Sequence, residues 1–504
     1  MDPNALADKE ACAVEKVVVD SHQLDDGSAS EVSTYDPVDF DGLHDLSDPQ
    51  NWTLMYKWSM VVLISLLSLV VNLAILMCAP ATSYILGEFH STNKLDSTIL
   101  VSIWELGEVV GSFLVAPLSE IYGRLPVYHA ANILFIIFAI AAAESISMGM
   151  LIAMRFFLGL SVASTVINPC IVGDMFREEQ RGRALGIMGM IPFIAPVLGP
   201  TVGGFISQAK GWRWTFWLIV IIASPLQLLF LLFYRETYRV RILQRKAARL
   251  RKETGNHSLR SRYELNKTPA IMLRDSVFRP LQLLFTSPVV LLVGICSALN
   301  MSLVYVIITS LSIIYDEVYH FRKGFLGLTY LGLGFGMILS VHFCGQFLDR
   351  YLQRKIAAGH GRPEHRLPPM VLGSVLVPLG VLAFGWTVQM HVHWVVPILF
   401  STLVGFGFVA NSISAWSYLV DAFGIYAASA TAGNVVLRNA ASAALPLAGP
   451  PLSERLGFGL GYSVLALVGV LAVPISLILM YMGERMRYSG TSSGDQQGKD
   501  NRAD

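Results

Sequence analysis

Residues 58–80 read WSMVVLISLLSLVVNLAILMCAP, an apolar run without a charged side chain. About 20 such residues in a helix are long enough to cross the ~30 Å hydrocarbon core of a bilayer. Backbone N–H and C=O groups find no water there, so a spanning segment satisfies them internally by forming a helix. This stretch therefore predicts a transmembrane α-helix and, with it, a membrane protein.

Runs of similar length recur along the chain and predict about twelve transmembrane helices. The predicted spans are residues 58–80, 97–117, 127–146, 149–172, 184–206, 214–234, 287–310, 325–346, 367–388, 394–418, 427–448 and 460–482. The composition agrees, because 54% of the residues are hydrophobic and only 14% are charged, against about 25% charged in soluble proteins. We expect an all-α membrane protein with no nucleic-acid partner.

The charged residues are sorted by side of the membrane. Lys and Arg crowd the connections that follow spans 2, 4, 6 and 8, whereas the opposite connections carry only scattered cations. The positive-inside rule therefore places both termini in the cytosol.

The long connection at 235–286 divides the spans into two sets of six, which predicts two related halves. Residues 1–50 hold thirteen Asp/Glu and two Lys, a composition that cannot bury enough surface to fold alone. The expected segments are an acidic, disordered cytosolic tail at 1–50, a six-helix half at 51–234, a basic cytosolic linker at 235–286, a second six-helix half at 287–487, and a disordered tail at 488–504.

The connection between spans 2 and 3 reads APLSEIYGR at residues 116–124. Glu120 can pair with cations at a helix end, and Gly123 permits a tight turn before Arg124. After span 8 the chain reads GQFLDR at residues 345–350. This is a second copy at the matching place in the other half, and it contributes Gly345, Asp349 and Arg350.

Two further motifs lie inside predicted spans. Span 4 contains RFFLGLSVA from Arg155, and a central Arg costs about 2.5–3.5 kcal/mol on insertion scales. Arg155 therefore either reaches the outer interface or faces the bundle interior. Span 5 contains APVLGPTVGG at residues 195–204, a kinked helix with small residues that another helix can approach closely. Its motif residues are Gly199, Pro200, Gly203 and Gly204.

Together these motifs resemble the major facilitator superfamily, and in particular its fungal drug:proton antiporters with twelve spans. The lead-in DPQNW at 48–52 and YLVD at 418–421 add to a resemblance that covers residues 48–487. Ala116 and Ala195 depart from the family pattern, which has Gly at both places. The resemblance implies the major facilitator fold, two pseudo-symmetric six-helix halves, and a span-5 motif that is typical of exporters.

The resemblance also implies roles for individual charged residues. Arg155 would face the interior and modulate a carboxylate. The residues expected in gates or interhelical ion pairs are Asp174, Arg181, Arg183, Asp421 and Arg438.

Span 2 carries two carboxylates in WELGEVVG, at Glu105 and Glu108. Residues three apart lie on adjacent parts of one helix face, here near mid-membrane. Such a pair suits a group that takes up and releases protons. The alternative is that both carboxyls stay protonated and only form hydrogen bonds between helices.

A site for an organic solute is mostly apolar with a few placed polar groups. Taken singly, residues of these types are more often helix-packing residues. The candidates are Trp104, Asn168, Asn300, Tyr305, Tyr330, Asn411 and Trp416.

We expect a monomeric plasma-membrane transporter that exports a small lipophilic drug, toxin or secondary metabolite by proton antiport. Its expected partners are this substrate, protons and the lipid bilayer. We expect no cofactor, no metal site and no enzymatic activity, because no cysteine or histidine set has metal-ligand or catalytic spacing. Two alternatives remain: a proton-coupled importer of a small nutrient with the same fold, and a membrane sensor that does not transport.

Overall fold

A computed structural model describes residues 37–41, 45–91, 93–162, 164–256, 258–261, 269–357, 362–423 and 427–500. The chain divides into two compact units. The smaller unit combines Met1–Phe40 with Leu243–Glu264, and the larger unit combines Asp41–Ile242 with Leu265–Asp504.

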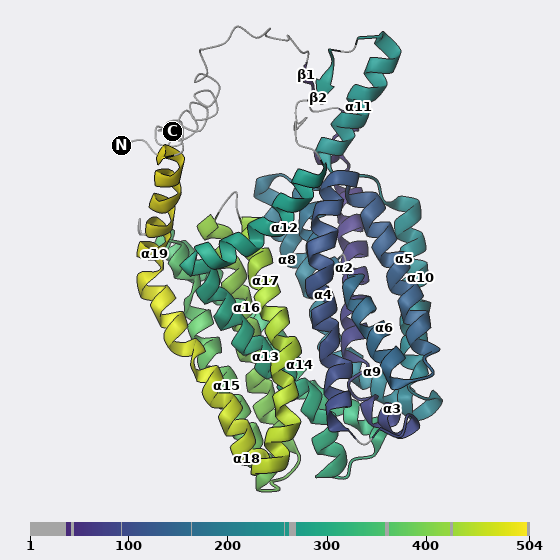
Figure 1. Cartoon of the computed structure of the whole chain (residues 1–504), viewed down its shortest axis with the longest axis vertical. Helices are drawn as coiled ribbons and strands as arrows, with labels where there is room; N and C mark the ends of the chain where they lie inside the picture. The colour runs from purple at the N-terminus through teal and green to yellow at the C-terminus, as the bar shows by residue number, and fades with distance from the viewer. Residues whose placement is uncertain are drawn as a thin grey trace. The chain divides into compact units, whose positions relative to one another are not determined.

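The regular elements described in the first half of the larger unit are helices (Figure 1). Its elements are η1 (Pro49–Asn51), α2 (Leu54–Leu76), α3 (Thr82–Glu88), α4 (Lys94–Tyr122), α5 (Arg124–Ala143), α6 (Met148–Leu160), α7 (Ser164–Met175), α8 (Glu178–Met190), η2 (Ile191–Ile194), α9 (Ala195–Lys210) and α10 (Arg213–Phe233).

The connecting segment and the second half are also mostly helical. The elements are α11 (Arg239–Thr254), α12 (Pro269–Thr286), α13 (Pro288–Glu317), η3 (Lys323–Tyr330), α14 (Leu331–Ala357), η4 (Pro363–Arg366), α15 (Pro368–Gln389), α16 (Val395–Phe423), α17 (Ala427–Ala444), η6 (Leu445–Ala448), α18 (Gly449–Val470) and α19 (Ala472–Asp500). The all-α membrane fold is thus confirmed.

Ten helical stretches of the described chain are long and apolar enough to span a membrane. Two differences from the twelve predicted spans account for the lower number. The span at 149–172 is divided into α6 and α7, and the last two spans form one stretch, Ser429–Met486. That stretch bends at Gly457, whose φ of 77° is in the left-handed region that suits glycine. If the divided helix counts once and the bent stretch twice, twelve spans result.

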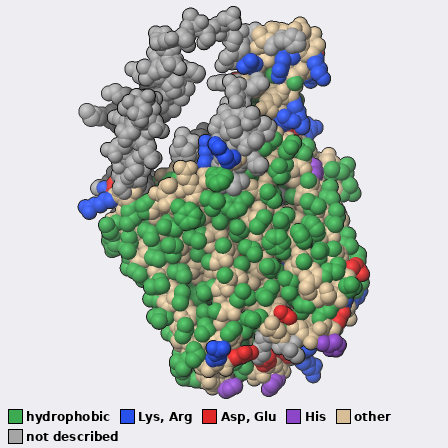
Figure 2. All heavy atoms as spheres, in the orientation of Figure 1, with side chains coloured by type: hydrophobic (Ala, Val, Ile, Leu, Met, Phe, Trp, Pro, Cys, Tyr) green, Lys and Arg blue, Asp and Glu red, His purple; other side chains and the backbone are tan. Residues whose placement is uncertain are grey.

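The side surface of the larger unit is apolar. Figure 2 shows hydrophobic side chains over most of the face drawn, with Lys and Arg at its upper and lower ends and Asp, Glu and His mainly toward the lower end. On α10 alone, Leu228, Leu231, Leu232 and Phe233 are exposed. Monomeric soluble proteins rarely expose contiguous apolar patches larger than a few hundred Å², so this surface fits contact with lipid.

Glycines allow α4 and α6 to touch backbone to backbone. A Cβ at Gly107 would lie 2.1 Å from the carbonyl oxygen of Phe156, and one at Gly111 would lie 2.3 Å from that of Leu160. Gly159 of α6 faces α4 in the same way. Only glycine leaves room for such an approach.

The same arrangement recurs between α14 and α16, the matching helices of the second half. A Cβ at Gly336 would lie 2.0 Å from the carbonyl oxygen of Thr402, and one at Gly405 would lie 2.1 Å from that of Leu333. Gly332 and Gly336 repeat the four-residue spacing of Gly107 and Gly111. This repetition supports two structurally related halves.

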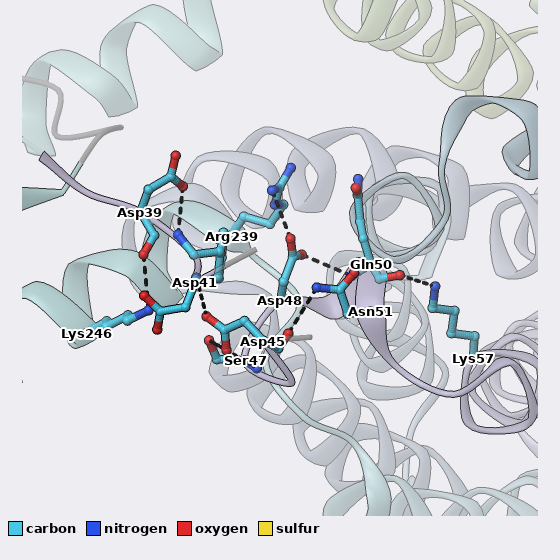
Figure 3. A network of polar contacts seen from close by, with 11 residues as sticks. Asp39, Asp41, Asp45, Ser47, Asp48, Gln50, Asn51, Lys57, Arg239 and Lys246 are labelled. Carbon is cyan, nitrogen blue, oxygen red and sulfur yellow. Dashed lines mark hydrogen bonds and ion pairs between the residues drawn. The ribbon is translucent and has the colours of Figure 1, made fainter. Parts of the chain in front are cut away.

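The lead-in to α2 is held by a polar network (Figure 3). The carboxylate of Asp48 accepts hydrogen bonds from the Gln50 backbone N–H, at 3.1 Å, and from Arg239 Nη2, at 3.0 Å. Lys57 Nζ donates to the carbonyl oxygen of Gln50 at 2.6 Å. The predicted segment boundary at residue 50 falls inside this network.

The smaller unit contains a short parallel ladder in which β1 (Pro37–Val38) pairs with β2 (Arg260–Ser261). Next to β1, Lys246 Nζ of α11 donates to the carbonyl oxygen of Asp39 at 3.1 Å. Val38 is buried, and so are Leu243 and Ala247 on α11. Residues 37–39 are therefore anchored beside α11.

Glu88 ties α3 to the start of α10. Its carboxylate accepts a hydrogen bond from Trp212 Nε1 at 2.6 Å and pairs with Arg213, which also donates to the carbonyl oxygen of Ser145 at 3.0 Å. Partial burial would raise the pKa of Glu88, but hydrogen bonds from Arg213 and Trp212 outweigh it and hold the pKa below its ordinary value of 4.5.

We expect Glu88→Gln to lower the melting temperature of the purified protein at pH 7. A carboxyl whose pKa is lower in the folded state stabilises fully above its unfolded pKa, and that stabilisation is lost as the pH falls through the folded value. The difference between wild type and variant should therefore shrink below about pH 4. Glu144→Gln, at an exposed position on α5's end, is the control. A difference that is constant from pH 7 to pH 3 would contradict this account.

Candidate functional site

Glu105 lies where helices of the two halves meet. It is 2% exposed, on α4. Its Oε1 accepts a hydrogen bond from the Tyr305 hydroxyl of α13, and its Oε2 lies 3.5 Å from the Ser442 hydroxyl of α17. The structure thus brings together two residues that the sequence singled out separately, and it adds Ser442. A buried carboxylate of one half is held by two hydroxyls of the other.

Two further charges surround Glu105. Glu108 lies one turn further along α4, is buried, and interacts electrostatically with Glu105. The positive charge of Arg438, on α17, attracts the carboxylate of Glu105. The Arg438 Nε donates a hydrogen bond to Asn439 Oδ1 at 3.0 Å. The site therefore combines two acidic residues of the first half with one basic residue of the second half.

Arg155 lies inside the first half and not at its outer interface. Its fully buried guanidinium donates to three carbonyl oxygens, those of Leu100 at 3.0 Å, Ala74 at 2.8 Å and Ile75 at 3.1 Å. It also lies over the Trp104 ring, 4.9 Å from the centroid. Carbonyl partners offset part of the cost of burying this charge, and they join α6 to α2 and α4.

The predicted substrate-binding residues lie in separate places. Trp104 is fully buried between Arg155 and Phe135. Asn168 donates to Ser68 Oγ at 2.7 Å, inside the first half. Trp416 differs from these, because 52% of it is exposed.

Two predicted asparagines of the second half both contact Cys296. Asn300 donates to the carbonyl oxygen of Cys296 at 2.8 Å, and Asn411 lies 3.4 Å from both Cys296 Sγ and Ser374 Oγ. Tyr330 makes separate contacts, to the Ser312 hydroxyl at 2.8 Å and to the Ile308 carbonyl oxygen at 2.7 Å.

Two pockets lined by described residues lie away from Glu105. The larger has a volume of about 140 Å³ and the smaller of about 10 Å³, and neither is lined by a predicted substrate-binding residue. The lining of the larger pocket is Tyr351, Arg362, Glu364, His365, Pro368, Met480, Tyr481 and Glu484. At Glu105 the halves are in direct contact through the Tyr305 and Ser442 hydroxyls.

The connection between α4 and α5 forms a compact charged cluster. Arg124 donates to Ser119 Oγ at 2.6 Å, lies 3.6 Å from an Asp174 carboxylate oxygen, and covers the Tyr238 ring at 4.7 Å. Burial raises the pKa of Tyr238 to about 12, although Arg124 opposes this, so the phenol stays neutral. Glu120 adds an attractive charge near Arg124.

Glu236 completes this cluster and was not predicted. Its carboxylate accepts hydrogen bonds from the backbone N–H groups of Arg124, at 3.0 Å, and Leu125, at 3.2 Å. Glu236 therefore caps the start of α5. Gly123 precedes this start with φ of 100°, and a Cβ there would lie 2.4 Å from Glu236 Oε2. The sequence holds one signal of this cap, an acidic residue just after the sixth predicted span.

The other predicted gating residues fall into two groups. Arg181 Nη2 donates to the carbonyl oxygen of Gly173 at 3.1 Å, and Asp421 of α16 pairs with Arg366 of η4. The remaining residues lie in helices, but their side chains are outside the described residues, so their roles stay predictions. They are Arg183, Gly345, Asp349 and Arg350.

The span-5 motif faces two partners. On one side, a Cβ at Gly203 would lie 2.5 Å from the carbonyl oxygen of Met77, after α2, and Gly199 also packs on α2. On the other side, Gly204 lies against η3 of the second half, where a Cβ at Gly327 would lie 2.0 Å from the carbonyl oxygen of Pro200. The motif therefore joins the two halves as well as packing within one.

We expect Gly327→Ala to lower the melting temperature, because the added Cβ meets backbone that cannot move aside without separating η3 from α9. Overpacking of this kind costs about 1–3 kcal/mol. Gly186→Ala is the matched control, since a Cβ there meets no atom within 4 Å. Equal melting temperatures for the two variants would show that the contact is not tight.

We expect Glu236→Ala to lower the free energy of unfolding by about 2 kcal/mol, because it leaves two N–H groups at the start of α5 without an acceptor. Glu144→Ala, at the other end of α5, should change it little. Denaturant or thermal unfolding in detergent measures both. An unchanged stability in Glu236→Ala would mean that water replaces the cap.

Comparisons with known proteins agree with this architecture. The sequence profile of the Major Facilitator Superfamily matches residues 62–446. The chain is 41% identical over 454 residues to the efflux pump radE of Floropilus chiversii, covering 89% of this chain and 84% of the relative. It is 38% identical to the MFS-type transporter atr4 of Stereocaulon alpinum, and the match covers 97% of this chain and 88% of the relative.

A solved structure of similar fold is the xylose transporter XylE of E. coli in a partially occluded inward-open conformation. The TM-score is 0.61 at 17% identity, over 84% of this chain and 97% of that chain. This likeness concerns the fold alone. On the profile match and the relatives, the chain belongs to the Major Facilitator Superfamily and is a membrane transporter, not an enzyme.

Proposed function

We propose that this transporter exports a small lipophilic organic compound in exchange for protons. The relative that is named an efflux pump supports the export direction. The observation that supports coupling of transport to protons is the buried carboxylate of Glu105, which contacts hydroxyls of the opposite half.

Proton binding at Glu105 would weaken the contact between the halves. An ionised carboxylate accepts charge-assisted hydrogen bonds, which are about twice as strong as neutral ones. It also attracts Arg438 across the interface. Protonation removes both advantages, so it favours a state in which α4 separates from α13 and α17. A proton thereby shifts the equilibrium between two arrangements of the halves.

Glu108 and Arg155 complete the proposed coupling. The negative charge of Glu108 disfavours ionisation of both acids together, so the pair is suited to hold one proton. Arg155 supplies a fixed positive charge, because its guanidinium is locked by carbonyl oxygens and cannot lose its proton.

The substrate would bind between the halves when they part. Tyr305 and Ser442 are placed polar groups at this contact, in a mostly apolar core, which is the chemistry of a site for a lipophilic solute. We further propose a plasma-membrane location with both termini in the cytosol, on the strength of the basic connections after spans 2, 4, 6 and 8.

The proposal predicts the behaviour of Glu105→Gln in proteoliposomes. A substrate is first chosen from a panel of lipophilic aromatic compounds as one that raises the melting temperature. With an imposed pH gradient, wild type should move it toward the side from which protons leave. Glu105→Gln keeps the shape but loses the charge, and should reduce gradient-driven transport at least tenfold. Glu108→Gln should also reduce it, and Glu144→Gln is the control.

Two results would contradict the proposal. If the solute accumulates on the side that the protons enter, the protein is an importer. If Glu105→Gln and Glu108→Gln both transport as wild type does, the proton is carried elsewhere. Circular dichroism and melting temperature check that each variant is folded.

A further inference from the structure

The part of α11 in the smaller unit has one apolar side and one basic side. Leu243 and Ala247 are buried. Arg245, Arg249 and Lys252 are exposed. At helical spacings of four and three residues, these cations share one face, opposite the buried pair. We call Arg245, Arg249 and Lys252 the basic stripe.

The basic stripe has little counter-charge of its own. One acid, Glu253, lies within this part of α11, where its carboxylate is 3.5 Å from Arg249 Nε, with both side chains more than half exposed. Exposed pairs of this kind contribute little. A concentration of like charge attracts an acidic partner.

Acidic sequence enters the described structure beside this helix. Residues 1–36 contain nine Asp/Glu and two Lys. The described chain starts at Pro37, where β1 pairs with β2, and Lys246 of α11 holds the carbonyl oxygen of Asp39 (Figure 3). The acidic segment is therefore attached to the same unit that carries the basic stripe.

We propose that residues 1–36 of this chain bind along the basic stripe of α11. Three observations support this occupant: opposite charge, the anchor at Val38 and Asp39, and sufficient length. From Arg245 to Lys252 the helix rises only about 10 Å, whereas a few extended residues reach that far at about 3.3 Å each. Attachment beside the helix also gives the segment an effective concentration of about a millimolar.

The rival partner is an anionic lipid surface, which exposed Lys/Arg clusters also attract. Binding of the acidic segment would shield the basic stripe from the lipid headgroups. We favour the segment because the residues directly after it already contact α11, through Asp39.

Carbodiimide crosslinking of the full-length protein tests the proposal. The reagent condenses an Asp or Glu carboxyl with a Lys amine into an amide and takes up the lost water as a urea. In nanodiscs of phosphatidylcholine at 50 mM NaCl, mass spectrometry should find Lys252 joined to carboxyls of residues 1–36. At 1 M salt, charges that lie more than about 3 Å apart are screened from one another. The crosslink yield should therefore fall at least fivefold at 1 M NaCl.

Charge variants separate specific binding from chance encounter. The double variant Arg245→Glu with Arg249→Glu should reduce the Lys252 crosslink at least fivefold. Adding Asp25→Lys and Asp26→Lys to it should restore at least half of the yield. Arg455→Glu, at an exposed position in α18, is the control and should leave the yield unchanged. An unchanged melting temperature shows that each variant is folded.

Three outcomes would overturn the proposal. The first is the absence of Lys252 crosslinks to residues 1–36 at low salt. The second is a yield that does not respond to charge reversal. The third is loss of the crosslinks in nanodiscs that contain phosphatidylserine, which would make the anionic lipid the partner of the basic stripe.

Discussion

A carboxylate buried in an apolar bundle must be compensated, and the way in which Glu105 is compensated connects the two halves of this transporter. Its hydrogen-bond partners, Tyr305 and Ser442, come from α13 and α17 of the opposite half. Separation of the halves therefore exposes Glu105 to a different environment, and a change in its charge alters the contact between them. Arg155, by contrast, donates its hydrogen bonds within its own half, to backbone carbonyl oxygens.

Close backbone contacts at glycines occur both within each half and between the halves. Within each half, glycines let paired helices touch, α4 with α6 and α14 with α16. Between the halves, Gly327 and Pro200 make an equally close contact where η3 meets α9. The span-5 motif makes both kinds of contact, because Gly203 packs within its half and Gly204 faces the other. This double role explains a run of small residues that a single interface would not require.

The sequence predicted the fold class and the spans because hydrophobic length is a local property. It also singled out Glu105, since a charge within an apolar run stands out. Its pairing with Ser442 could not be predicted, because serine is common in helices and the contact joins residues far apart in the chain. Glu236 was missed for a similar reason, as an acid after a span resembles an ordinary boundary residue. Trp104 and Asn168 are buried in contact with neighbouring helices, and residue type does not distinguish a ligand contact from helix packing, so their role in substrate binding stays a prediction.

The glycine crossings have a consequence for the kind of motion that the molecule allows. At each crossing the carbonyl oxygen of one helix occupies the space of an absent side chain in its neighbour. A shift along the helix axis would bring that oxygen against the side chains that flank each glycine, so these contacts resist sliding within the α4–α6 and α14–α16 pairs. We therefore expect each pair to move as one rigid unit during transport, so that the halves change their arrangement by rotation and not by sliding within a pair.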